Sequence, residues 1–225
     1  MEKLGKHQAN VKVTFELREH LDQVLAVQKA LRQGLAAHDR WSTRGLKRQQ
    51  AAQLRAAWRR EQDRLRSAGE LLDTVDVLAM HGIELELRER GWWDRRWPAV
   101  PDEAMDPGRW PGSRDAGYPK QVPLRLPQPL ARKVYAACWH TSYKSITALR
   151  EWRDQHPGIV PGRHRRGPGE PDIALEEYER LAARVTTVGD VYRGGLLRGI
   201  RAAEALRLRA ANQRVGRKVA GHRGP

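Results

Sequence analysis

The stretch from Lys120 to Trp152 constrains the fold more than any other part of this 225-residue chain. Val122, Leu124 and Leu126 alternate with polar residues or proline, and this period of two predicts a short strand with one apolar face. Pro127 ends the strand, and proline is tolerated in the first turn of a helix. Apolar residues then recur at helical spacing on both sides of a serine-containing turn. The stretch therefore predicts a strand, a helix, a tight turn and a second helix.

This pattern, LRLP followed by a short amphipathic helix and a turn with serines, resembles the ribbon-helix-helix family of DNA-binding proteins. In that family two strand-helix-helix units pair their strands into an antiparallel ribbon that enters the major groove. The resemblance implies base contacts from outward strand residues, with arginine suited to guanine and glutamine to adenine. It also implies phosphate contacts from the start of the second helix, where plain helix capping is a compatible role. The residues expected to contact DNA in this unit are Lys120, Gln121, Arg125, Ser142, Lys144 and Ser145.

Residues 171–206 repeat the plan. Ile173 and Leu175 predict a short strand, and a helix, a turn over Thr186–Asp190 and a second helix follow. This segment also resembles a ribbon-helix-helix unit, so the chain would carry two units, at about 120–156 and 171–206. Plasmid-transfer accessory proteins with two such units in one chain are the closest functional resemblance.

The two expected units could pair with each other within one chain, because a strand-helix-helix unit cannot bury its apolar face alone. Asp172 would repel phosphate, so the second strand would serve mainly folding, or its register differs from the one assumed. A simple helical bundle over residues 120–200 is the alternative. Antiparallel pairing of 121–126 with 172–175 would distinguish the two.

The formal net charge of +15 predicts a polyanionic partner, because neutralised phosphates release condensed counterions. Nucleic acid is the commonest such partner. An anionic membrane surface is less favoured, since no apolar run of transmembrane length and no signal-peptide pattern is found. Within the Pro/Gly-rich connector that follows the second helix, Arg163, Arg165 and Arg166 could reach phosphates, or the connector is an ordinary linker.

The first 90 residues predict a helical α+β domain, which could mediate self-association or partner binding. Alternation indicates a strand over 11–16 that passes directly into a helix ending near His38, and a second strand over 83–88 after a helix stop at Gly82. A strand followed at once by a helix also begins a ribbon-helix-helix unit, although this helix is too long for one. Residues 44–80 predict two antiparallel helices with a break at Gly69, surrounded by arginines that either form a solvated face or contact phosphate.

The fold class expected overall is mainly α with short strands. The expected divisions are a helical α+β domain at 1–90, a Trp/Pro-rich linker at 91–119, a tandem ribbon-helix-helix-like module at 120–206 and a basic C-terminal arm at 207–225. Tryptophans of the linker either stack on exposed bases or, as favoured here, bury apolar area against the neighbouring domains.

No motif for catalysis, cofactor or metal binding is found. A phosphate-cradling glycine loop and the HExxH spacing are missing, and the single cysteine, Cys138, cannot build a thiolate zinc site. One cysteine agrees with a reducing cytoplasm and with a role in helix packing. The expected function is that of a cytoplasmic, non-enzymatic protein of a bacterial mobile element, a regulator or accessory factor that binds double-stranded DNA. The alternative is a structural or assembly protein that coats DNA or RNA without reading it.

Overall fold

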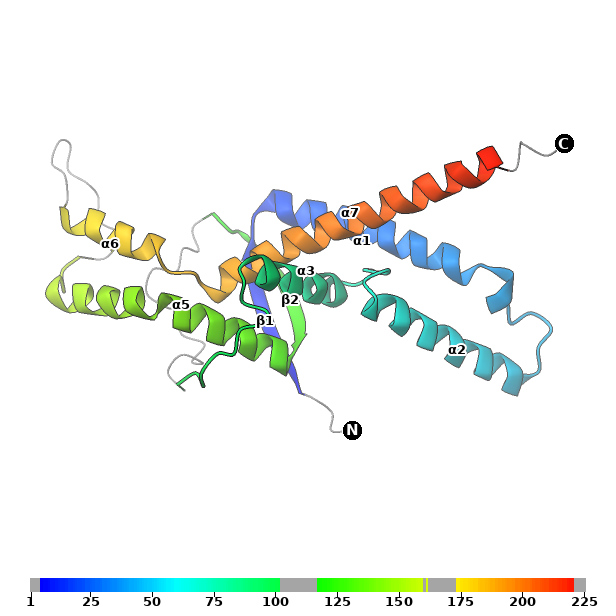
Figure 1. Ribbon diagram of the computed structural model, residues 1–225, viewed down its shortest axis with the longest axis horizontal. Helices are drawn as coiled ribbons and strands as arrows, with labels where there is room; N and C mark the ends of the chain where they lie inside the picture. The colour runs from blue at the N-terminus through cyan, green and yellow to red at the C-terminus, as the bar shows by residue number, and fades with distance from the viewer. Residues whose placement is uncertain (1–4, 102–116, 160, 162–172, 221–225) are drawn as a thin grey trace.

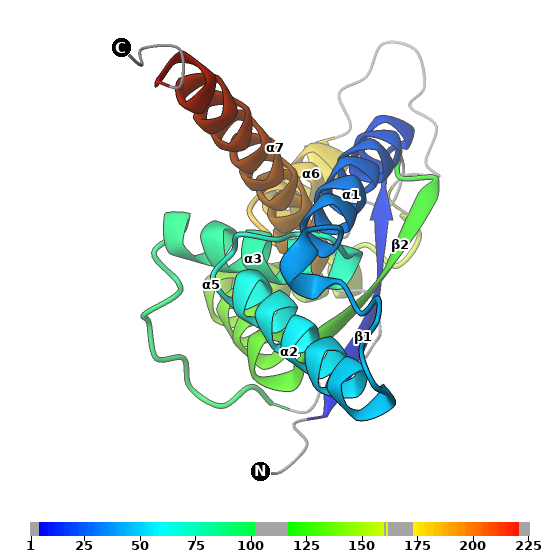
Figure 2. The same ribbon diagram turned by 90° about the vertical axis from the view of Figure 1, so that its right-hand side faces the viewer.

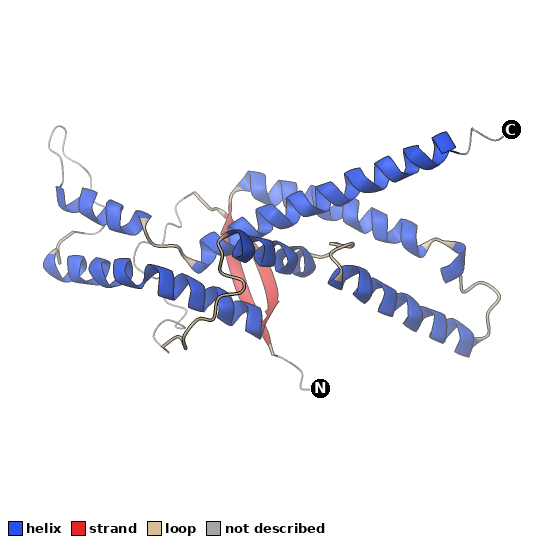
Figure 3. Ribbon diagram, viewed as in Figure 1, coloured by secondary structure: helices blue, strands red, loops and turns tan. Residues whose placement is uncertain are grey.

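The computed structural model describes residues 5–101, 117–159, 161 and 173–220, of which 210–220 in their backbone only. The described part is mainly helical, with one small two-stranded antiparallel sheet that crosses the middle of the molecule (Figure 3). The elements in chain order are β1 (Lys6–Val13), α1 (Phe15–Ala36), the 3-10 turn η1 (Asp39–Trp41), α2 (Arg48–Ser67), α3 (Val75–Glu89), β2 (Lys120–Pro127), α5 (Gln128–Gln155), α6 (Ile173–Ala183) and α7 (Val188–Ala220).

The strand expected after residue 120 is confirmed as β2, but its partner is at the other end of the chain. β1 pairs antiparallel with β2, with Val11 opposite Val122. The expected strand at Ile173 and Leu175 is wrong, because these residues open helix α6. Two alternating apolar residues are too few to distinguish a strand from the first turn of a helix.

Helix α5 is continuous, so the expected turn near Ser142 is wrong. Trp139, Ser142, Ile146 and Leu149 are buried three or four residues apart, which keeps one helical face in contact with the rest of the molecule. No residue in this stretch forces a break, since serine alone does not end a helix that has such a continuous apolar face.

Of two further expectations for the N-terminal region, one is confirmed and one is wrong. The break at Gly69 is confirmed, because this residue has a φ of 68° directly after α2. The strand at 83–88 is wrong, since Gly82 lies inside α3 and Ile83 and Leu87 are buried one helical turn apart. Glu86 of α3 is buried and accepts hydrogen bonds from Arg90 and Arg198.

Helices α3 and α7 cross at very short range. A Cβ atom on Gly82 would overlap the backbone carbonyl of Gly195, and one on Gly195 would lie 3.0 Å from the Cα of Ile83. Only glycine permits this approach of two helix backbones. The crossing lies at the centre of a buried cluster that also takes in the inner faces of both strands and residues of α1 and α5.

The fold consists of two similar halves at a constant offset of 113 positions along the sequence. The first half consists of β1, the long helix α1, α2 and α3. The second half consists of β2, the long helix α5, α6 and α7 in the same order. Corresponding residues, in pairs, are Gln8 and Gln121, Lys12 and Arg125, Thr74 and Thr187, and Gly82 and Gly195. The repeat is therefore much longer than the expected one, and the hydrophobic core does not divide at the expected boundary near residue 91.

Candidate nucleic-acid interface

The outer face of the β1–β2 ribbon carries a compact set of polar side chains. Across the two strands, Gln8 stands opposite Arg125 and Lys12 opposite Gln121, with the pair Asn10 and Pro123 at the centre. All six are exposed except Lys12, which is half-buried. The alternate positions point inward and form the apolar face, where Val11, Val13, Val122, Leu124 and Leu126 are buried.

The ribbon separates the three strand residues expected to contact DNA. Gln121 and Arg125 lie on the outer face, as their alternation predicts. Lys120 stands opposite Val13 and hence on the other face, at the end of the strand. Its ammonium group lies 4.6 Å from the centre of the Phe15 ring, a cation–π contact that directs it away from the outer row.

Both edges of the ribbon are tied to the helices behind it at corresponding positions. The backbone N–H of Arg125 donates to Asp76 Oδ1 of α3 at 2.9 Å. On the opposite strand, Arg193 of α7 donates to the backbone carbonyl of Lys12 at 3.2 Å. These bonds satisfy outward-facing backbone groups of the two-stranded sheet and attach the backbone of both strands to the helices.

The starts of α3 and α7 flank these two edges and are capped by threonines. Thr74 Oγ1 accepts from the N–H of Val77 at 3.3 Å. Thr187 Oγ1 accepts from the N–H of Asp190 at 3.1 Å, and Asp190 accepts in turn from the N–H of Thr187 at 2.9 Å. Such helix starts carry partial positive charge and attract anions. The start of α7 lies in the expected turn over Thr186–Asp190, and Thr74 is the position in the first half that corresponds to Thr187.

Carboxylates at these helix starts are engaged by neighbouring donors. Burial acts to raise the pKa of Asp190, but hydrogen bonds from Thr187 and Arg193 outweigh it and hold this pKa below its usual value. Arg193 Nη2 lies 2.6 Å from Asp190 Oδ1. Asp76 is bound to the N–H of Arg125. Both carboxylates are therefore engaged by neighbouring donors, and that of Asp190 is also paired with a cationic side chain.

The serines expected to bind phosphate lie elsewhere. Ser142 is 1% exposed and bonded to Thr186, whose N–H donates to Ser142 Oγ at 2.9 Å. Lys144 is exposed and Ser145 half-buried, but both lie inside α5 and not at a helix start. Ser142 thus joins α5 to the start of α7. Arg163, Arg165 and Arg166 lie outside the described residues.

Sequence reasoning placed the first strand at 11–16, whereas β1 spans Lys6–Val13, and it did not name the outward residues Gln8, Asn10 and Lys12 as candidate contacts. The signal was present, because Ala9, Val11 and Val13 alternate with these polar residues just as the apolar residues of β2 do. The first part of β1 lies in a polar N-terminal segment, and the alternation there was not recognised as a strand. Comparison with the segment 113 positions later would have shown a matching strand.

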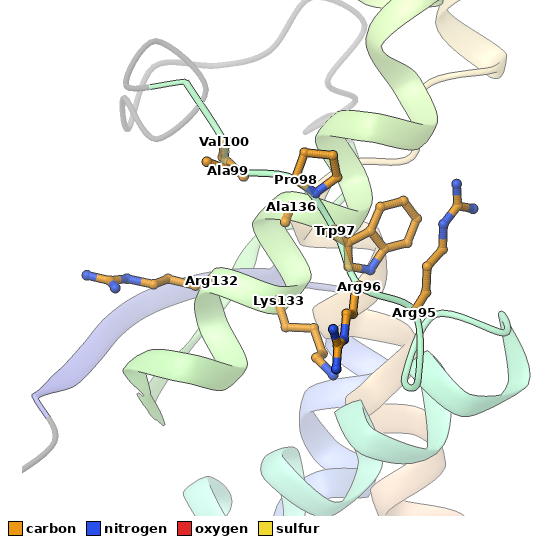
Figure 4. Close-up of a pocket in the computed structure, with 9 residues that line it drawn as sticks. All are labelled: Arg95, Arg96, Trp97, Pro98, Ala99, Val100, Arg132, Lys133 and Ala136. Atoms are coloured by element: carbon orange, nitrogen blue, oxygen red, sulfur yellow. The ribbon is translucent and has the colours of Figure 1, made fainter.

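The Trp-rich segment after α3 lies against α5, where it forms an open, basic cavity of about 800 Å³ (Figure 4). Lys133 donates to the backbone carbonyl of Trp93 at 2.5 Å. Trp97 stacks on His140 with ring centres 6.2 Å apart. The described tryptophans here are thus fixed against a helix, in agreement with the favoured interpretation. Trp110 lies outside the described residues.

Other chemistry is not evident in the described part of the chain. No group of three or more potential metal ligands occurs among these residues. Cys138 is fully buried among apolar side chains, and burial raises the pKa of its thiol, which suits the expected packing role. None of the described helices is long and apolar enough to cross a lipid bilayer.

Comparison of the chain with protein-family models, with curated proteins and with solved structures gave no match. Function must therefore be argued from the chemistry of the ribbon and its surroundings.

Proposed function

We propose that this protein binds double-stranded DNA by inserting the β1–β2 ribbon into the major groove, in the manner of the ribbon-helix-helix family. The observation that carries the proposal is the register, which places Gln8 beside Arg125 and Lys12 beside Gln121 on one exposed face. The major groove admits a two-stranded ribbon, and these side-chain types match the donors and acceptors of base edges there. The biological role proposed with it is that of a regulator or accessory factor of a mobile element.

The ribbon of one chain takes the place of the paired strands of two subunits. Arginine and lysine donate to guanine, and glutamine and asparagine form paired hydrogen bonds with adenine. Arg125 and Lys12 occupy corresponding positions, as do Gln8 and Gln121, so a nearly palindromic site is expected. The centre of that site differs between its two strands, because Asn10 corresponds to Pro123.

Selection of bound sequences from a random duplex pool tests the proposal, followed by Arg125→Ala. This variant should lose about 1 to 3 kcal/mol of discrimination at one base pair, because a bidentate contact is removed. Lys144→Ala is the control, since Lys144 is exposed on α5 and away from the ribbon. An equal loss on all sequences would show that Arg125 contacts phosphate and does not read a base.

The second candidate function is non-specific coating of DNA or RNA, which the net charge of +15 favours. Pure phosphate binding gives the same affinity and the same salt dependence on every duplex. A salt titration on one selected site and on random DNA therefore separates the two functions. The coating function is supported if the two curves coincide.

A further inference from the structure

Helix α2 carries cationic side chains that are not part of the β1–β2 ribbon. Arg48, Arg55 and Arg59 follow one another at spacings of seven and four residues, which places them on one helical face. All three are exposed, and none forms an ion pair with a described carboxylate. By contrast, Arg64 and Arg66 near the end of the same helix are paired with Glu61 and Asp73.

The charge is concentrated at the tip formed by η1 and the start of α2. From His38 to Arg60 inclusive, the sequence has seven arginine or lysine residues and a single acidic residue, Asp39. The tip therefore has a strong local positive charge. A solvated helix face of ordinary composition would intersperse both signs.

The position of α2 is fixed relative to the ribbon by a buried carboxylate. Asp73, whose side chain is 0% exposed, accepts from Arg66 at 2.8 and 2.9 Å and from Arg32 of α1 at 3.1 Å. Asp73 directly precedes Thr74, the cap of α3 at the ribbon edge. Trp41 and Trp58 pack together at 5.1 Å and close the tip. The cationic face is thus held on a defined support.

The direction of α2 agrees with that of a duplex bound to the ribbon. A ribbon lying in the major groove follows the groove, which advances only about 34 Å along the axis per turn, so the duplex axis must run across the strands. In Figure 1 the strands run vertically and α2 projects to the right, across the strand direction. In Figure 2 the helices α3, α5 and α7 lie mainly to the left of the ribbon. The start of α2 reaches further right than the lower ends of the strands, whereas the upper end of β2 lies further right still.

We propose that the start of α2 is a second contact surface for the phosphate backbone of the same duplex, on one side of the ribbon only. Arg48, Arg55 and Arg59 neutralise phosphates there, and the bound site is longer on the α2 side. The 20 residues of α2 span about 30 Å, which corresponds to roughly nine base pairs at 3.4 Å each. This inference rests on the proposed function.

The arm on the other side of the ribbon supplies the matched control. Arg150, Arg153 and Arg184 are exposed on α5 and just after α6. The same two helices carry five acidic residues: Glu151, Asp154, Glu176, Glu177 and Glu179. Replacing these three arginines removes the same charge from the protein. It should leave duplex binding nearly unchanged, because the described residues from 140 to 184 carry as many acidic as basic side chains.

The test measures dissociation constants against salt concentration on a 50-base-pair duplex with the selected site at its centre, or on a random duplex of that length if selection yields no site. Arg48→Gln, Arg55→Gln and Arg59→Gln combined should lower the slope of log affinity against log salt by roughly 2 to 3, because three phosphate contacts are lost. Affinity should fall by roughly tenfold or more at low salt. Lysine at the same three positions should restore the slope.

Hydroxyl-radical footprinting on the same duplex should show protection that extends further on one side, and this extension should disappear in the glutamine variant. Unchanged thermal unfolding midpoints establish that all variants are folded. An unchanged slope in the α2 variant, or an equal decrease in the α5–α6 control, would overturn the inference and leave the ribbon function intact. If the wild-type protein binds no duplex, the proposed function itself fails, and the inference with it.

Discussion

On one side of the ribbon α6 packs along α5, and on the other α2 folds back below α1 (Figure 1). These two arms occupy corresponding places in the two halves, yet different interactions hold them. The α5–α6 pair shares a buried apolar cluster to which Ile146, Leu149 and Val185 belong. The α2 helix is held by the carboxylate of Asp73 and by the Trp41–Trp58 contact, and only Ala51 of its residues is buried.

The difference shows how one architecture can supply both a packed support and a charged surface. An arm that buries apolar area must turn one face inward, whereas an arm held by a few ion pairs keeps most of its surface in solvent. The long helices α1 and α5 also differ in the buried hydrogen bonds that join them to α7 and to the segments before α3 and α7. Gln28 of α1 accepts from the N–H of Leu72 and donates to the carbonyl of Ala203, while Ser142 of α5 bonds only to Thr186.

The largest effect on the free energy of unfolding is expected at the α3–α7 crossing, where the two halves meet. Gly82→Ala should reduce the free energy of unfolding by about 3 kcal/mol, because the added methyl group forces the backbones of α3 and α7 apart. Gly34→Ala is the matched control, since no atom lies within 4 Å of the added Cβ in α1, and it should be neutral or stabilising by up to about 1 kcal/mol. Urea denaturation measures both. Equal effects of the two variants would mean that the close crossing does not hold the halves together.

Asp73→Asn tests the α2 arm, with an expected loss of about 2 kcal/mol, because charge-assisted hydrogen bonds from Arg66 and Arg32 are removed. Burial acts to raise the pKa of Asp73, but the two arginines outweigh it and lower this pKa in the folded protein. The carboxylate therefore contributes stability above the usual aspartate pKa of about 3.9, and this contribution is lost as the pH falls through the lower folded value.

Unfolding free energies measured from pH 7 down to pH 3 should thus show wild type approaching the Asp73→Asn variant at the acid end. Asp63→Asn serves as the control, because Asp63 is 75% exposed and lies 3.6 Å from Arg66, so little change is expected. A constant difference between wild type and the Asp73 variant at every pH would contradict the role of the ionised carboxylate.

The smallest effect on the free energy of unfolding is expected for a substitution in α5. Ser142→Ala should cost about 1 kcal/mol, because the N–H of Thr186 loses its acceptor in a buried place. Ser145→Ala, half-buried in the same helix, should change stability by less. Affinity for duplex DNA, corrected for the folded fraction, should stay the same in both variants. Weaker DNA binding by a fully stable Ser142→Ala protein would restore the phosphate-contacting role predicted from the sequence.

Local patterns in the sequence predicted part of the local structure. The alternation around Val122 and Leu124 predicted β2 and its outward side chains, and the helix expected to end near His38 corresponds to α1, which ends at Ala36. Both depend on periodicity within one element, which neighbouring residues determine. The outward position of Arg125 follows from the same alternation.

The partner of β2 could not be predicted from these local patterns. Pairing with β1 joins residues more than a hundred positions apart, and the apolar alternation of one strand does not specify which other strand it meets. Gly82 was misread for a related reason. A glycine that ends a helix and one that permits a close crossing look alike until the second helix, with Gly195, is placed against it.

Because β1 and β2 belong to one polypeptide, the ribbon does not have to assemble from separate subunits. Its unfolding midpoint should be independent of protein concentration, whereas a ribbon shared by two chains dissociates on dilution. The entropy of closing so long a loop rises only with the logarithm of its length, so the distance between the strands adds little to the cost. The two subunits of a symmetric dimer must have the same sequence. When one polypeptide contains both halves, a mutation in one strand or one arm leaves the other unchanged.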